Sequence, residues 1–248
     1  MRRSERAKPE PAAGWCSLRD MAQLFSLPLT EKNKLWMALA VGTFAMATYK
    51  IAGELSLRNN PRLLSFSSLD LAIPFIPWTV WIYMSVYLIY LASVLLQRDL
   101  AVLGRFLGSY VIAYGIAMFF FVLYPTTFPR ELFPIPPGSG VSGTVLEYFR
   151  LTDRPTNCLP SLHVSSCVMV TLPFWSRRPW LFCAFALWTI AISVTTLTTK
   201  QHYAVDVVTG ALFGAICYYA TPWVHGWLSR DTVASEFPPS GKMPPTGG

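Results

Sequence analysis

A histidine and an aspartate four residues apart carry the strongest chemical signal in this chain. His202 and Asp206 stand at the start of an apolar run, and on a helix this spacing places both side chains on one face. The carboxylate can then accept a hydrogen bond from one imidazole nitrogen and leave the other nitrogen free to attack an electrophile. The pair predicts a nucleophilic histidine with an orienting acid.

A second polar group opens another apolar run upstream. Pro160, Ser161 and His163 follow shortly after Arg154. Proline is favoured at the first position of a helix, so we expect free backbone N–H groups and the Ser161 hydroxyl together at a helix start, where a phosphate oxygen binds well. Arg154 can bind the same anion through its guanidinium, and His163 can donate a proton to a leaving oxygen. Lys200 fits a further phosphate contact and an interfacial anchor equally well.

The composition indicates that membrane helices position these groups. Hydrophobic residues make up 53% of the 248 residues and charged residues only 13%. The apolar residues fall in six blocks, and the longer blocks reach the roughly 20 residues that a membrane crossing needs. The sequence therefore predicts an all-α polytopic membrane protein with a bundle of six transmembrane helices. The blocks are residues 35–49, 78–96, 101–124, 162–175, 180–198 and 203–219.

The basic residues predict an orientation for this bundle. Lys and Arg are more frequent in the two tails and in the second and fourth connections than in the alternate connections. By the positive-inside rule both termini are expected in the cytoplasm, and the active site on the outer, periplasmic or lumenal, face. The net charge of +7 is explained by this orientation, so no nucleic-acid partner is expected.

Three regions are expected along the chain. Residues 1–33 are a cytoplasmic tail in which residues 17–25 can lie as an interfacial helix, residues 34–224 form the six-helix catalytic domain, and residues 225–248 form a disordered tail. The proline-rich connection 125–159 is expected to be a lid or binding loop.

The sequence gives no sign of a metal or cofactor. The five cysteines form no Cys-x-x-Cys pair and no Cys/His metal spacing, and no glycine-rich nucleotide loop is present. We therefore expect metal-independent chemistry without a cofactor.

These motifs resemble the type 2 phosphatidic acid phosphatase superfamily, the membrane phosphatases related to vanadium haloperoxidases. The resemblance implies a six-helix core, a phosphohistidine intermediate on His202, His163 as general acid and Asp206 as its orienter. The matching residues are Arg154-Pro155, Pro160-Ser161-Leu162-His163 and His202 with Asp206.

Two positions depart from the family pattern. Glu147 stands where the family has a lysine, seven residues before the arginine, and Thr195-Thr196 replace a Ser-Arg pair. Lys200 or Arg150 can compensate for these missing cations. The departures resemble a divergent branch that includes inositol phosphorylceramide synthases and sphingomyelin synthases, which pass a phosphate-bearing head group to a lipid alcohol.

Three functions follow from these observations. The first is a membrane lipid phosphatase that hydrolyses a lipid phosphate or diphosphate through phosphohistidine. The second is a lipid phosphotransferase that uses the same intermediate with an alcohol as acceptor. The third, motivated by Glu147 and Thr196, is a noncatalytic transporter or scaffold. A membrane lipid and the bilayer are the expected partners, while the particular lipid and the oligomeric state stay open.

Overall fold

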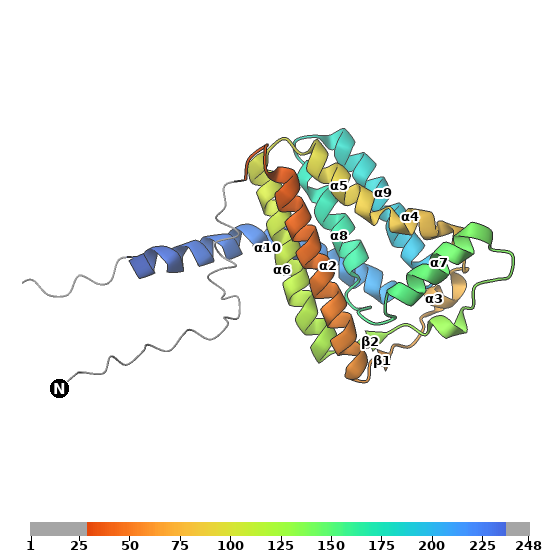
Figure 1. The fold of residues 1–248 in the computed structure, drawn as a ribbon. Coiled ribbons are helices and arrows are strands. Elements are labelled where there is room, and N and C mark those ends of the chain that lie inside the picture. The colour runs from red at the N-terminus through yellow and green to blue at the C-terminus, as the bar shows by residue number, and fades with distance from the viewer. Residues whose placement is uncertain (1–28, 237–248) are drawn as a thin grey trace, which may run out of the picture.

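A computed structural model describes residues 29–236, and this part of the chain is mostly helical (Figure 1). Five helical stretches are long and apolar enough to cross a membrane, which fits a multi-pass membrane protein. They are α2 (Lys34–Arg58), the segmented stretch Pro77–Leu96, α6 (Leu100–Leu123), α9 (Pro179–Thr198) and the Ala204–Gly226 part of α10 (Ala204–Glu236).

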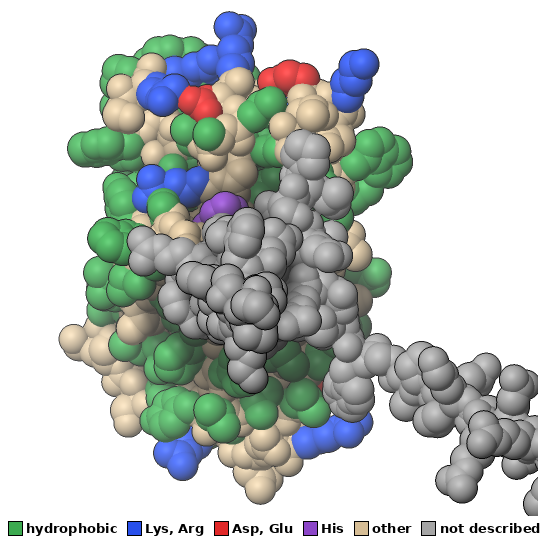
Figure 2. Space-filling model, turned by 90° about the vertical axis from the view of Figure 1, so that its left-hand side faces the viewer, with side chains coloured by type: hydrophobic (Ala, Val, Ile, Leu, Met, Phe, Trp, Pro, Cys, Tyr) green, Lys and Arg blue, Asp and Glu red, His purple; other side chains and the backbone are tan. Residues whose placement is uncertain are grey.

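The surface of this bundle has the polarity that a membrane requires. Large apolar side chains such as Trp36, Phe119 and Leu212 are more than half exposed. On the face shown in Figure 2, hydrophobic side chains cover much of the surface that the grey atoms leave visible between the two ends, and most of the visible charged side chains lie toward the ends. An apolar belt of this kind is stable against lipid and not against water.

Each of the six apolar blocks was expected to span the membrane, but the fourth block forms a shorter helix. It comprises α8 (Leu162–Thr171) and a 3-10 turn, η3 (Leu172–Phe174). Eight of the ten residues of α8 are buried, and the helix packs against α5, α6, α9 and α10 near the middle of the bundle (Figure 1). The described residues therefore hold five candidate spans, while α8 is a central helix covered by its neighbours.

The second apolar block is divided into three helical pieces. They are η1 (Pro77–Thr79), α4 (Val80–Met84) and α5 (Val86–Leu96). At the division the Ser85 hydroxyl donates to the carbonyl of Ile82 and accepts a hydrogen bond from the Trp188 indole N–H at 2.7 Å. This contact ties the division to α9.

Small elements cap the end of the bundle that carries the predicted site residues. The connection 125–159 is folded and contains β2 (Thr126–Thr127), η2 (Arg130–Leu132) and the amphipathic helix α7 (Gly140–Thr152). Strand β1 (Arg62–Leu63) pairs with β2 in parallel, and α3 (Ser68–Ala72) lies at the same end (Figure 1). We call these elements the end cap.

The end of α10 corrects one expectation. The helix continues to Glu236, past the boundary expected at residue 224, so residues 225–236 are helical and not a disordered tail. The reason is that this stretch has no Pro-Pro or Gly-Gly pair before Pro238, where a helix cannot readily continue. The expected interfacial helix at residues 17–25 lies outside the described residues.

Two glycines let α10 approach α8 closely. A Cβ atom on Gly210 would lie 2.5 Å from the carbonyl oxygen of Ser161, and one on Gly214 would lie 2.5 Å from that of Ser165. Both distances are far below van der Waals contact. This Gly-x-x-x-Gly spacing is typical of helix pairs that pack backbone to backbone in membranes.

The close approach makes Gly214 sensitive to one added methyl group. Gly214→Ala should destabilise the fold by about 1–3 kcal/mol, because the two backbones must separate. Gly115→Ala is the matched control on α6, since nothing lies within 4 Å of its Cβ position. We expect thermal unfolding in detergent to show a lower Tm only for the Gly214 variant. Equal Tm values for the two variants would contradict the packing argument.

Candidate active site

His202 and Asp206 form the pair that their spacing predicts. The Nδ1 atom of His202 lies 3.2 Å from Oδ2 of Asp206. The histidine is 7% exposed and the carboxylate is fully buried. With a proton on Nδ1, the lone pair of the neutral imidazole lies on Nε2.

The local geometry of the pair differs from a shared helix face. His202 lies in the turn before α10, and Asp206 lies in the first turn of that helix. Oδ2 of Asp206 also accepts a hydrogen bond from the backbone N–H of Tyr203 at 2.9 Å. An acid at the third helical position commonly caps a helix start in this way. The capping bond fixes the carboxylate that holds the histidine.

Ser161 faces the other nitrogen of the predicted nucleophile. Its Oγ lies 3.3 Å from Nε2 of His202, and its backbone N–H donates to the carbonyl of Asp206 at 3.1 Å. Ser161 is the N-cap of α8, so Pro160 precedes the helix and does not occupy its first position as expected. A Ser hydroxyl and the start of a helix nevertheless meet at Nε2, as the phosphate-binding interpretation requires.

His163 stacks on a tyrosine that the sequence did not indicate. The ring centroids of His163 and Tyr83 are 4.4 Å apart, and the Tyr83 hydroxyl lies 3.3 Å from Nδ1 of His163. The centroids of the His163 and His202 rings are 6.0 Å apart, so one phosphoryl group could contact both rings. The structure thus brings His163, His202, Asp206 and Ser161 together, and their catalytic roles stay predictions.

The two predicted phosphate cations have other partners. Arg154 is half exposed, and its Nε donates to Glu54 of α2 at 2.7 Å. The ammonium group of Lys200 is buried and donates to the carbonyls of Asp70 and Ile73 at 2.9 and 2.6 Å. Burial lowers the pKa of Lys200 from its usual value. Their phosphate-binding role also stays a prediction.

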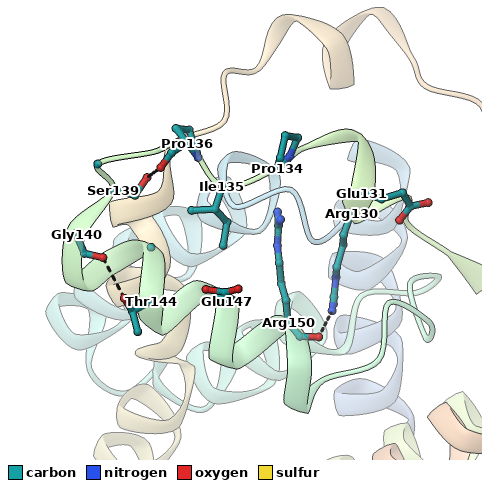
Figure 3. Close-up of a pocket in the computed structure, with 12 residues that line it drawn as sticks. Arg130, Glu131, Pro134, Ile135, Pro136, Ser139, Gly140, Thr144, Glu147 and Arg150 are labelled. Atoms are coloured by element: carbon teal, nitrogen blue, oxygen red, sulfur yellow. Dashed lines mark hydrogen bonds between the residues drawn. The ribbon is translucent and has the colours of Figure 1, made fainter.

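Two further arginines border a polar cavity of about 600 Å³ in the end cap, next to α7 (Figure 3). Arg150 donates to the carbonyls of Phe133 and Thr199, and Arg130 donates to the carbonyl of Asp153 at 2.6 Å. Burial and the neighbouring Arg130 lower the pKa of Arg150 to about 10. No motif spacing marks Arg130 in the sequence.

Asp70 is another residue that the sequence analysis missed. It is 6% exposed, and its Oδ1 accepts the N–H of Ala204, the first residue of α10, at 2.6 Å. Its Oδ2 accepts from Ser67 in a capping box that starts α3, while its carbonyl accepts from Lys200. Helix α3 therefore holds both sides of the turn that carries His202.

An apolar groove of about 800 Å³ leads from this site into the bundle. It runs between α2, α5, α6 and α8, with His163 and Asp153 at its polar end and Ala38 toward the other. Its wall is rich in tyrosines, namely Tyr49, Tyr87, Tyr90, Tyr110 and Tyr114. Asp153, buried at the polar end, accepts a hydrogen bond from Tyr49 at 3.3 Å and forms ion pairs with Lys50 and Arg130.

One cluster of side chains in the described part of the chain could hold a metal ion. The ligand atoms of Cys158, His202 and Asp206 lie within 4.8 Å of one another, and all three residues are buried. The spacing of these residues in the sequence gives no sign of this group.

A helix bundle with a buried His–Asp pair, a second histidine and a serine-capped helix start is the arrangement that we expect of a membrane phosphoesterase. A family model described as the PAP2 superfamily matches residues 72–220, which is more than half of the chain. The chain belongs to this superfamily. Membership supports an enzyme and suggests lipid phosphatase or phosphotransferase activity.

A curated relative adds no function. An uncharacterized protein of Methanocaldococcus jannaschii is 34% identical over 96 residues, which are 38% of this chain and 40% of that protein. The chain therefore matches less than half of the length of this relative.

The contacts of Asp70 predict an effect on catalysis. Asp70→Ala should lower kcat on the order of 10²-fold, because His202 loses its fixed position. Asp99→Ala is the matched control, since Asp99 caps the start of α6 through the N–H groups of Ala101 and Val102, at the other end of that helix from β2. Each variant should lose about 1 kcal/mol of stability. Turnover and Tm measured together test this, and equal loss of kcat in both variants would rule out a positioning role.

Proposed function

We propose that the protein is an integral membrane enzyme that cleaves a lipid phosphate or diphosphate through a phosphohistidine on His202. Family membership supports phosphoester chemistry. The lipid substrate is inferred from one observation. His163 belongs to the polar site and also lines the apolar groove. The distribution of Lys and Arg supports a site on the outer face with both termini in the cytoplasm.

The mechanism that we assign to this site has two steps. Nε2 of His202 attacks phosphorus while His163, as imidazolium, gives a proton to the leaving oxygen. Asp206 accepts a hydrogen bond from the Nδ1–H group of His202 and stabilises the positively charged imidazole that forms. The neutral His163 then takes a proton from water, which attacks the phosphohistidine and releases phosphate. Ser161 and the start of α8 stabilise the phosphoryl oxygens.

The dimensions of the groove fit one membrane leaflet. Along α2 its lining runs from Ala38 to Lys50, which at a rise of 1.5 Å per residue corresponds to about 18 Å. Half of the hydrocarbon core of a bilayer is about 15 Å thick. A lipid chain could therefore lie in the groove along its length while its phosphate reaches the histidines.

Filling the groove should separate long-chain from short-chain substrates. Gly42 lines the groove, and a Cβ atom there would meet only the ring of Tyr90, at 3.9 Å. Gly42→Leu should raise KM or lower kcat/KM for a long-chain lipid phosphate about tenfold or more, because a Leu side chain occupies the space of the lipid chain. A short water-soluble phosphate ester should be turned over as before.

Gly115→Leu provides the control for this substitution, because open space surrounds its Cβ position on α6. Kinetic constants for a series of chain lengths are the measurement. If Gly42→Leu and Gly115→Leu lower long-chain turnover equally, the groove does not bind the lipid.

Replacing each of the two histidines should impair a different step of the reaction. His202→Ala should abolish the phosphoenzyme, since the attacking nitrogen is gone. His163→Ala should slow cleavage of a lipid ester on the order of 10²–10⁴-fold, and less for a nitrophenyl ester, whose leaving group needs no proton. Radiolabelled phosphate that is retained on base-quenched protein and lost in acid is the measurement, with His225→Ala as the control. Wild-type phosphoenzyme in His202→Ala would disprove the assignment of the nucleophile.

Head-group transfer is the second candidate, and the partners of the cations favour it. Arg130, Arg150 and Lys200 all donate to backbone carbonyls, and Arg154 pairs with Glu54. A phosphate monoester carries a charge of about −1.5 to −2 at pH 7, whereas a diester carries one negative charge. A site with few free cations suits the diester of a phospholipid head group.

A lipid panel separates these functions. The purified protein in detergent is given phosphatidic acid, a polyprenyl diphosphate and a phospholipid diester, each with and without ceramide or diacylglycerol. Release of free phosphate supports hydrolysis, and formation of a new phospholipid that depends on the alcohol supports transfer. Absence of both in a folded protein would favour the noncatalytic alternative.

A further inference from the structure

Cys158 lies beside the proposed nucleophile and has no part in the mechanism above. The thiol is 1% exposed, and its hydrogen bond is a weak one to the carbonyl of Pro155 at 3.4 Å. Its Sγ lies within 4.8 Å of a ligand atom of His202 and of Asp206. Sulfur, imidazole nitrogen and carboxylate oxygen are together the ligand types that Zn²⁺ prefers in proteins.

A second observation at the same place indicates a missing partner. Asp206 is fully buried, and its Oδ1 atom has no hydrogen-bond partner among the described residues. A buried carboxylate oxygen without a partner is costly, and an ion is one of the common reasons for such an atom. Oδ2 is already bound to His202 and Tyr203, so Oδ1 remains available as a ligand.

Zinc binding requires the three ligand atoms to move closer together. Zn–S and Zn–N bonds are about 2.3 and 2.0 Å long, so two ligand atoms on a tetrahedral zinc are separated by roughly 3.5 Å. The three atoms here are already within 4.8 Å of one another. Three protein ligands leave the fourth tetrahedral position for water or a phosphate oxygen.

The elements that carry the three ligands are held in place. The segment before Cys158 is pinned by the bridge between Thr127 and Thr156, and the thiol packs in a cluster with Phe128 and Tyr203. Asp206 is fixed by its capping bond at the start of α10. The backbone therefore stays in place, and the reorganisation that binding needs is limited to side chains, which favours affinity.

We propose that Cys158, His202 and Asp206 form an inhibitory zinc site, an inference about the same site that rests on the proposed function. A neutral imidazole has one lone pair, so a zinc-bound His202 cannot attack phosphorus whichever nitrogen binds. As the Zn–S bond forms, the Cys158 thiol releases its proton to solvent, and no electron is transferred. The thiolate selects Zn²⁺ or Cd²⁺ over Mg²⁺ and Ca²⁺.

Zinc alone is the probe in the test. Untagged full-length protein in detergent is titrated with Zn²⁺ against a chromophoric chelator, and turnover of a nitrophenyl phosphate is measured in parallel. We expect one zinc per chain, inhibition that EDTA reverses and no inhibition by Mg²⁺. Cys158→Ala should keep its basal turnover and should weaken both zinc binding and inhibition by at least about tenfold. Cys167→Ala, a buried cysteine within α8, is the matched control.

The binding assay keeps this proposal separate from the proposed function. If no phosphate ester is turned over, the proposed function fails, while zinc stoichiometry still tests the site. Co²⁺ gives a second readout, because a bound thiolate produces charge-transfer absorption that Cys158→Ala should remove. Equal zinc affinity in the wild type and Cys158→Ala, or no bound zinc in the wild type, would overturn the proposal.

Discussion

The active site depends on how closely α8 and α10 approach each other. The two sequence motifs are about forty residues apart in the chain, yet the N–H of Ser161 donates to the carbonyl of Asp206. This bond requires the backbones to be nearly in contact, and the glycines of α10 allow it because they add no side chain. The distance between Ser161 and His202 is therefore set by backbone packing and not by flexible side chains.

This contact also explains why α8 is short. A helix enclosed by four others need not span the hydrocarbon core by itself, since its ends are covered by protein and its polar groups find partners there. Ser165, Ser166 and Thr171 lie along its buried length, and their hydroxyls hydrogen-bond within the bundle. The same burial keeps lipid away from the predicted catalytic residues except along the groove wall.

The sequence predicted what depends on local spacing and hydropathy. The six apolar blocks are helical, and His202 pairs with Asp206, because periodicity and a spacing of four residues are local properties. Asp70, Cys158 and Arg130 could not be predicted, because each reaches the site through contacts between segments far apart in the chain. Helix α7 was missed because the flanking prolines masked its amphipathic pattern.

The cations of the end cap show how a chain can change its use of charge and keep its fold. Carbonyl groups at the last turn of a helix carry partial negative charge and lack partners within the helix. Arg130 occupies such carbonyls at the end of α7, and Lys200 occupies them at the end of α3. Each cation therefore stabilises a loop next to the predicted nucleophile. Its positive charge is partly compensated by these carbonyl groups before any phosphate binds. The helix start at Ser161 must then supply more of the anion stabilisation than in a site with free arginines.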